Sequence, residues 1–242
     1  MIGKIILFGV ICFLCYAIIP TYYNKWLNPS VLKNLGEGNE ILLTFDDGPD
    51  PRYTPQLLDL LKEEHVPAAF FVVGENARAN PELLRRMKEE GHTVSLHSYS
   101  HSNNWLLSFR KLKKELEEGL AAAPASCYRP PWGRSNLFLN HLLKKHGLQM
   151  VLWDVMAQDW QKSATPELIC EKLLKRVKPG SIICLHDAGE NSGGAKDAPL
   201  RTTEALRKAI PALRAKGCRF VSLDTIFVKE EAETWPQIKS HC

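Results

Sequence analysis

The chain has 242 residues, a formal net charge of +4 and 24% charged residues. This length supports a sizeable buried core, and the charges are spread over segments of mixed sign, which argues against a nucleic-acid partner. Its seven cysteines are scattered and suggest no disulfide framework. We therefore expect a single globular domain with an N-terminal appendage.

The N-terminal appendage is an almost wholly apolar run, Ile5–Pro20, with aromatic residues after it. About 17–20 apolar residues span a bilayer, and aromatic side chains gather at its interface. No small-x-small cleavage site follows the run, so residues 1–23 are predicted to be a membrane anchor with the remaining chain outside the cytoplasm. A cleaved signal with a secreted product, or a buried domain helix, are the alternatives. The polar residues 24–37 are predicted to be a linker.

From residue 38 onward, short apolar runs alternate with amphipathic stretches. The runs that predict strands are Ile41–Phe45, Ala68–Val73, Thr93–Leu96, Cys127–Arg129, Gln149–Trp153, Ser181–Leu185 and Arg219–Leu223. The stretches that predict helices are Tyr53–Glu64, Asn80–Glu90, Leu106–Leu120, Asn136–His146, Thr165–Val177 and Arg201–Lys216. Such alternation predicts an α/β fold of about seven parallel strands, close to the number that closes a barrel, in one domain at 38–242.

Polar side chains follow several of the predicted strands. In parallel α/β folds, functional groups gather at the C-terminal ends of strands. The residues that follow these strands are Asp46 and Asp47, His97 and His101, Arg129 and Trp132, Asp154, Asp159 and Trp160, and His186 and Asp187. We expect this rim to carry the chemistry.

A metal site is predicted from two histidines and the paired carboxylates. His97 and His101 are four residues apart, a spacing that places both imidazoles on one face of a helical turn. The Asp46–Asp47 pair, whose side chains should diverge, supplies a third ligand and a base, and leaves coordination positions open. The alternatives are surface histidines, an Asx-turn at the aspartates, or a non-haem iron centre, which usually lies on an all-β scaffold.

Five ordered segments resemble the motifs of the polysaccharide deacetylases, the carbohydrate esterases with a NodB-like domain. They are Thr44-Phe45-Asp46-Asp47-Gly48-Pro49, His97-Ser98-Tyr99-Ser100-His101, Arg129-Pro130-Pro131-Trp132-Gly133, Asp159-Trp160 and Leu185-His186-Asp187. The resemblance implies a distorted (β/α) barrel and a divalent metal, usually zinc, with Co²⁺, Mn²⁺ or Ni²⁺ as alternatives. It also implies removal of acetyl groups from N-acetylated sugars.

The same resemblance implies roles for individual residues. Asp46 would be the general base and His186 the general acid. Asp47, His97 and His101 would be the metal ligands. These assignments agree with the chemistry of a metal-assisted amide hydrolysis, in which one group takes a proton from water and another gives one to the amine.

Five further residues are expected to support this set. Arg129 would position the base, the backbone N–H of Trp132 would hold the oxyanion, and Asp159 would tune the acid. Trp160 and Leu185 would line the acetyl pocket. Without the resemblance, Arg129 would be interpreted as a rigid strand exit and Trp160 as a core residue.

We therefore expect a metal-dependent hydrolase that removes N-acetyl groups from a cell-wall or extracellular polysaccharide, either peptidoglycan or a chitin-like polymer. It would be a monomer, anchored in a membrane, with its catalytic domain outside the cytoplasm. One alternative is a deacylase of a lipid-linked glycan. Another is a catalytically silent carbohydrate-binding homologue, although a silent relative should have lost part of the site.

Overall fold

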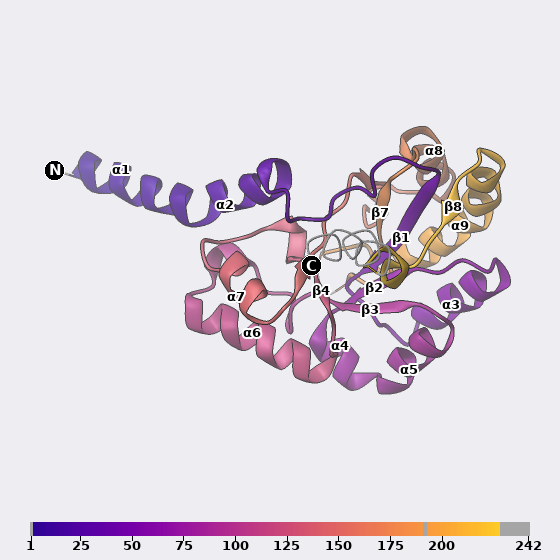
Figure 1. Cartoon of the computed structure of the whole chain (residues 1–242), viewed down its shortest axis with the longest axis horizontal. Coiled ribbons are helices and arrows are strands. Elements are labelled where there is room, and N and C mark those ends of the chain that lie inside the picture. The colour runs from indigo at the N-terminus through magenta and orange to yellow at the C-terminus, as the bar shows by residue number, and fades with distance from the viewer. Residues whose placement is uncertain (1, 191–192, 228–242) are drawn as a thin grey trace, which may run out of the picture.

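A computed structural model describes residues 2–190 and 193–227 of the chain. It shows a long helix that extends from one side of an α/β domain (Figure 1). The strands are β1 (Glu40–Asp46), β2 (Ala69–Val72), β3 (Thr93–Leu96), β4 (Cys127–Tyr128), β5 (Gln149–Met150), β6 (Val155–Met156), β7 (Ile182–His186) and β8 (Arg219–Phe220).

The strands form one curled parallel sheet. Its order is β5-β4-β3-β2-β1-β7-β6, with β8 paired to the start of β1. The end strands β5 and β6 are not paired with each other, so the sheet is a distorted, incomplete barrel. The predicted α/β barrel of about seven parallel strands is confirmed. Strand β6 was not predicted, because two residues are too short for an apolar pattern.

One long N-terminal helix precedes the sheet, and the other helices cover the outside of the sheet. The helices are α1 (Ile2–Phe13), α2 (Ile19–Tyr22), α3 (Thr54–Glu63), α4 (Gly74–Ala79), α5 (Pro81–Glu89), α6 (Phe109–Ala122), α7 (Leu139–Lys145), α8 (Pro166–Arg176) and α9 (Ala198–Ala215), with short π or 3₁₀ segments η1 (Leu14–Ile18), η2 (Tyr23–Leu27), η3 (Asn104–Leu106) and η4 (Pro131–Gly133). The six predicted helices correspond to α3 and α5–α9. Helix α4 was not predicted because its six residues carry no amphipathic period.

Local sequence explains where these helices begin. Ser108 and Thr165 accept hydrogen bonds from backbone N–H groups in the first turns of α6 and α8. Proline stands at the first position of α5 and α8, where its missing N–H costs nothing.

The central strand β1 directs its side chains alternately to two sides of the sheet. Ile41, Leu43 and Phe45 pack into the hydrophobic cluster beneath the helices. Leu42 belongs to a second cluster inside the barrel. The alternation also turns Asp46, at the end of β1, toward the barrel interior.

Residues 24–37, predicted to be a linker, are instead packed on the domain. The N–H of Leu32 donates to the Met150 carbonyl over 3.0 Å, and its carbonyl accepts from Leu152 over 2.8 Å. Leu35 donates to the carbonyl two residues before β7 over 2.7 Å. The polar composition suggested a tether, but this backbone supplies partners for the open edge of β5.

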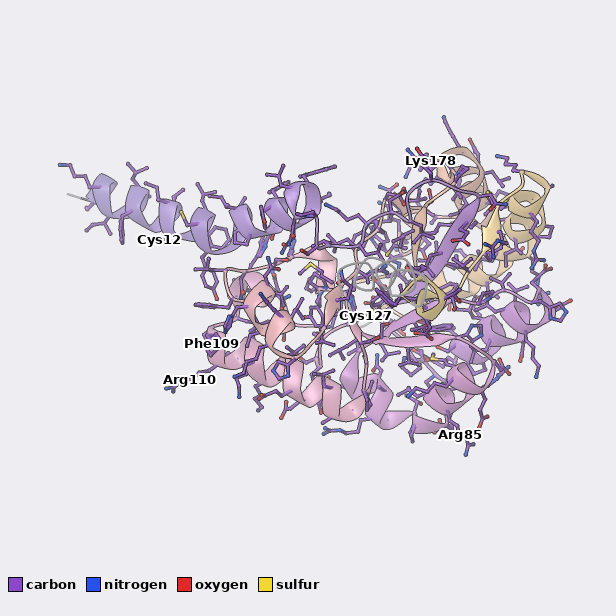
Figure 2. All side chains as sticks on the ribbon, viewed as in Figure 1. Cys12, Arg85, Phe109, Arg110, Cys127 and Lys178 are labelled. Carbon is purple, nitrogen blue, oxygen red and sulfur yellow. The ribbon has the colours of Figure 1, made fainter. Side chains whose placement is uncertain are left out.

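The N-terminal helical segment Ile2–Leu27 is 26 residues long and contains an 18-residue window with a mean hydropathy of 2.5, so it is long and apolar enough to cross a membrane. Its first part, α1, has no buried residue and stands clear of the domain, as the position of Cys12 shows (Figure 2). Farther along, Ala17, Thr21 and Asn24 are buried. Their spacing places them on one helix face, which therefore docks on the domain.

The docked face is held by polar contacts. Thr21 Oγ1 accepts hydrogen bonds from the Ser135 N–H over 2.9 Å and from Trp105 Nε1 over 2.8 Å. The side-chain amides of Asn24 and Asn140 exchange two hydrogen bonds of 3.0 and 2.8 Å. The helix is thus an integral part of the domain as well as a candidate membrane span.

Replacing Thr21 should separate the helix from the domain. Thr21→Val keeps the shape of the side chain and leaves the donors of Ser135 and Trp105 unpaired, at a cost of about 1–3 kcal/mol. Thermal unfolding of the full chain in detergent should show a lower Tm. The matched Thr225→Val, at an exposed position, should change the unfolding free energy by less than about 0.5 kcal/mol. Equal Tm values for the two variants would contradict the docking.

Candidate functional site

A cavity of about 380 Å³ lies at the C-terminal ends of the strands. Its lining residues are Lys25, Asp46, Asp47, His97, His101, Trp132, Trp153, Met156, Trp160, Cys184, His186, Gly193 and Gly194. Most of the polar side chains predicted at the rim therefore meet in one cavity. Because they come from loops after different strands, the parallel sheet is what brings them together.

The two adjacent carboxylates point to different partners. Asp46 is the last residue of β1, and Arg129 Nη1 donates to its Oδ1 over 2.6 Å. Asp47 has a φ of +79°, which turns the chain so that its Oδ1 lies 3.1 Å from His101 Nε2. The side chains of Asp46 and Asp47 diverge, as expected for adjacent residues. The left-handed backbone of Asp47 causes this divergence.

The two histidines are brought together by a loop, so the predicted helical turn was wrong. His97 directly follows β3, and no helix forms from there to His101. Ser98 and His101 have φ values of +63° and +54°, a left-handed conformation that non-glycine residues rarely adopt. His97 Nε2 nevertheless lies 3.5 Å from Asp47 Oδ1, so the two imidazoles and the carboxylate converge.

Glu115 of α6 holds this loop in place. Its Oε2 accepts from the backbone N–H groups of Tyr99 and Ser100 over 3.2 and 2.9 Å, and its Oε1 accepts from the Ser100 hydroxyl over 2.7 Å. Sequence reasoning missed this residue. Nothing in the amphipathic pattern of α6 distinguishes Glu115 from its neighbours Glu117 and Glu118.

The protonation of His97 suits metal ligation. Its Nδ1 lies 2.8 Å from the Arg129 carbonyl oxygen, and a carbonyl only accepts, so Nδ1 carries the proton. The lone pair of Nε2 therefore faces Asp47. Burial lowers the pKa of His97 to about 4, so the imidazole is neutral at neutral pH.

The donor set as a whole fits a divalent cation. One ligand atom from each of Asp47, His97 and His101 lies within 4.8 Å of the other two. Burial raises the pKa of Asp47, but the hydrogen bond from His101 and the charges of nearby histidines hold it well below its usual value. The Asp47 carboxylate and the imidazoles of His97 and His101 form a candidate Asp/His/His metal site with open coordination positions.

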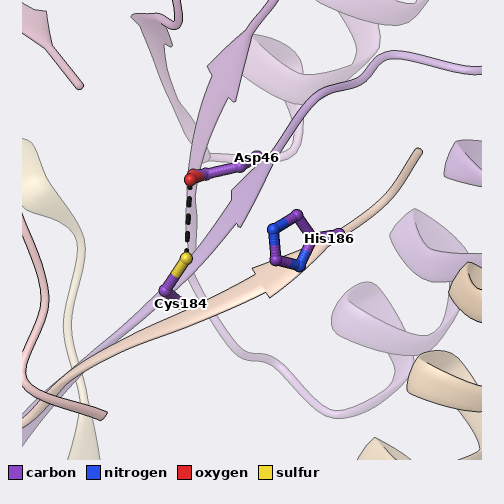
Figure 3. Close-up of side chains that lie close together, drawn as sticks. All are labelled: Asp46, Cys184 and His186. Atoms are coloured by element: carbon purple, nitrogen blue, oxygen red, sulfur yellow. Dashed lines mark hydrogen bonds between the residues drawn. The ribbon is translucent and has the colours of Figure 1, made fainter. Parts of the chain in front are cut away.

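A second cluster in the cavity consists of Asp46, Cys184 and His186 (Figure 3). The Cys184 thiol donates to Asp46 Oδ2 over 3.4 Å. Burial and the Asp46 charge raise the pKa of Cys184 well above its usual value, so the sulfur remains a thiol rather than a metal-binding thiolate. Since Arg129 already occupies the other oxygen of Asp46, this cluster suits proton transfer better than metal binding.

Asp159 sets the protonation of His186. Its Oδ1 lies 2.9 Å from His186 Nδ1, and its Oδ2 accepts from the His186 backbone N–H and the Thr202 hydroxyl, each over 2.9 Å. Burial lowers the pKa of His186, but the charge and hydrogen bond of Asp159 outweigh it and raise the pKa to about 10. The imidazolium is therefore present at neutral pH. The Trp160 ring packs edge-on against it at 5.2 Å.

Arg129 is fully buried, and each of its three guanidinium nitrogens has an acceptor. Its guanidinium donates to Asp46, to the Thr44 hydroxyl over 2.7 Å, and to the carbonyls of Val151 and Leu152 over 3.2 and 3.1 Å. This set of acceptors keeps its charge satisfied in the core and fixes the Asp46 carboxylate. Arg129 therefore lies beside the Asp46 carboxylate, where we expected it.

Two expected rim residues lie elsewhere. Leu185 is fully buried in the outer cluster with Phe45 and does not line the cavity. Alternation in β7 requires this, because Cys184 and His186 face inward. Asp154 accepts from the Ile182 N–H at the start of β7, the end opposite to His186. It therefore serves the sheet and not the cavity.

Trp132 lies in η4 with a φ of +54°. The centroids of its ring and the His101 ring are 4.4 Å apart, in an edge-to-face arrangement. Within the described part of the chain, its backbone N–H has no recorded hydrogen-bond acceptor. It is therefore available to a ligand. Gly193 and Gly194 also line the cavity.

Comparison with known proteins places this site in a family. The sequence profile of the polysaccharide deacetylase family matches residues 33–151. A peptidoglycan-N-acetylglucosamine deacetylase of Bacillus cereus is 35% identical over 214 residues, covering 86% of this chain and 94% of the relative. The chain belongs to the polysaccharide deacetylase family. The predicted family and enzyme class, polysaccharide N-deacetylase, are thereby confirmed.

Other polysaccharide deacetylases resemble the chain to a similar degree. A chitooligosaccharide deacetylase of Sinorhizobium fredii is 37% identical over 187 residues, covering 73% of this chain and 86% of the relative. A solved structure of a family 4 acetyl xylan esterase from Clostridium thermocellum, in complex with a cobalt ion, has a TM-score of 0.70 and 31% identity. It covers 79% of this chain and 92% of that chain.

Metal binding should depend on His101. His101→Ala removes one of three protein ligands and should weaken binding of Zn²⁺ more than tenfold, since even changes to groups that only support ligands cost about 10–100-fold. The measurement is metal content and affinity of the purified full chain, by elemental analysis and competition with a chelator. His141→Ala alters an exposed histidine and should leave both unchanged. Equal loss in the two variants would argue against the site.

Proposed function

We propose that this polysaccharide deacetylase is a divalent-metal hydrolase, with zinc as its cation, that removes N-acetyl groups from amino sugars of a cell-wall polysaccharide. The observation that carries the proposal is the placement of two opposite proton-transfer groups around one ligand set. Asp46, fixed by Arg129, and His186, charged by Asp159, line the same cavity as the Asp/His/His donors.

The comparisons support a glycan built from N-acetylglucosamine. Relatives are named as peptidoglycan-N-acetylglucosamine and chitooligosaccharide deacetylases. Of the two polymers, peptidoglycan suits a chain whose N-terminal helix is long and apolar enough to cross a membrane. We infer an anchored enzyme with its cavity on the extracytoplasmic side, where that polymer lies; a chitin-like polymer is the second candidate.

The first half of the reaction falls to Asp46. Asp47, His97 and His101 would hold a divalent cation, which would polarise the amide carbonyl and the attacking water. Asp46 takes a proton from that water, whose oxygen bonds to the carbonyl carbon. Arg129 holds the carboxylate in position for this transfer. The free N–H of Trp132 is the donor for the oxygen that becomes negative.

The second half falls to His186. Its imidazolium gives a proton to the amide nitrogen as the C–N bond breaks, which releases acetate and the free amine. Asp159 keeps the imidazole charged and orients its ring through Nδ1. The ring of Trp160 packs against His186, and Met156 and Trp153 also line the cavity.

Two alternatives are less well supported. A silent binding homologue would not need the complete ligand set together with both proton-transfer groups. A deacylase of lipid-linked glycans would be favoured by an apolar patch beside the cavity. Leu106 and Leu137 are exposed, but neither lines the cavity.

Acetate release tests the proposal directly. The full chain in detergent, stripped of metal and restored with Zn²⁺, should release acetate from peptidoglycan glycan strands or from chitin oligosaccharides. Asp46→Asn removes the proton acceptor and should lower kcat by about 10²–10⁴-fold, the usual contribution of general-base catalysis. Asp59→Asn, at an exposed position of α3, serves as control. Unchanged kcat in Asp46→Asn would contradict the assigned role.

The pH at which activity falls on the alkaline side should reflect the loss of the proton from His186. The pKa of this group is raised to about 10, so its proton is present below that pH and lost as pH rises through it. Asp159→Asn removes the main cause of the rise, and the alkaline limb of kcat should move down by at least about one pH unit. The same change should appear in the NMR titration of the imidazole. An unmoved limb would mean that another group is the acid.

A further inference from the structure

The N-terminal helix forms one wall of a groove beside the catalytic cavity. This groove, about 200 Å³ in volume, is bounded by Tyr22 and Lys25 from the helix and by Trp105, Trp132, Arg134 and Trp153 from the domain. We call it the helix groove. Sequence reasoning did not predict it, because Tyr22 and Lys25 were assigned to an anchor and a linker.

The helix groove is continuous with the site. Lys25, Trp132 and Trp153 line both the groove and the cavity that contains Asp46 and His186. A polymer with one sugar at the reacting position therefore places a neighbouring sugar in the groove. Its volume lies below the roughly 300 Å³ at which ligand pockets usually begin, so the groove holds a single sugar unit.

The groove carries positive charge without a counter-charge. Lys25 and Arg134 are its charged residues, and no carboxylate is among its lining residues in the described part of the chain. Within residues 2–190 and 193–227, neither cation belongs to a salt bridge. Two unpaired cations in a partly enclosed groove attract an anionic ligand.

Aromatic rings hold Arg134 and supply a surface for a sugar. The guanidinium carbon lies 4.4 Å from the Trp105 ring centroid and 5.2 Å from that of Trp132. These cation–π contacts orient the group while leaving its N–H donors available. The indole rings of Trp105, Trp132 and Trp153 line the groove and give it apolar surface against which a sugar ring can pack.

We propose that the helix groove is a subsite for a sugar that carries a carboxylate, next to the N-acetylated sugar in the catalytic cavity. Lys25 and Arg134 bind the carboxylate, and the tryptophans pack against the ring. The inference rests on the proposed deacetylation of a glycan. It names the substrate class more closely: an acidic heteropolymer in preference to a neutral homopolymer.

A pair of substrates that differ only in charge tests this subsite. One is a peptidoglycan glycan strand freed of its peptides, so that its lactyl carboxylates are ionised; the other is the same strand with those carboxylates methyl-esterified. The full chain in detergent should show a KM at least about tenfold lower for the free acid, the value expected for a charge-assisted pair. Equal KM values would overturn the proposal.

Variants of the groove residues test whether the groove causes the preference for the free acid over the ester. Lys25→Met combined with Arg134→Met should raise the KM for the acid to that for the ester, and Lys25→Arg should keep the preference. Lys178→Met is the matched control, because that exposed lysine lies between α8 and β7, away from α1 (Figure 2), and does not line the groove. A preference that survives the double variant would place the recognition elsewhere. Thermal unfolding of each variant verifies that it is folded.

Measurements of strand binding distinguish failure of this inference from failure of the proposed function. Quenching of tryptophan fluorescence reports binding of the strand whether or not acetate is released, because tryptophans line both the groove and the cavity. If neither strand is deacetylated, tighter binding of the acid that is lost in the double variant still supports the subsite, while the proposed reaction fails. If acetate is released and the two strands bind equally, the reaction stands and the subsite is wrong.

Discussion

The buried ion pair of Arg129 and Asp46 is the interaction on which the site depends. The guanidinium joins the end of β1 to the backbone after β5, and the carbonyl of the same residue fixes the tautomer of His97. One arginine therefore orients both the proposed base and a proposed metal ligand. Loss of either charge would leave the other buried and uncompensated, which typically costs about 3–5 kcal/mol. The chemistry and the stability of the barrel are therefore tied together at this point.

Much of the architecture could be predicted from short-range patterns. Alternating apolar runs and amphipathic stretches predicted the parallel sheet, and strand ends predicted where polar groups meet. The period of two residues in a strand also explains one error. Applied to β7, it places Cys184 and His186 inside and Leu185 outside, so the wrong pocket assignment of Leu185 was avoidable.

Other features depend on contacts that no local pattern encodes. His97 and His101 have helical spacing, but left-handed Ser98 and His101, held through Glu115, form a loop instead. Neither is glycine or asparagine, so the residue types gave no warning. Residues 24–37 have the composition of a tether, yet a polar segment is equally suited to pairing its backbone with an open strand edge. Only the open edge beside β5 in the folded domain shows that residues 24–37 pair with a strand and do not form a tether.

The docked N-terminal helix determines how the enzyme meets its substrate. A domain on a flexible tether would sweep through a range of heights and orientations above a membrane. Here, Thr21 and Asn24 fasten the helix to the domain by buried hydrogen bonds. With this helix in a bilayer, the cavity has a set height and a set direction. The distance from the bilayer at which the cavity can act is then fixed by the docked helix and not by the length of a flexible tether.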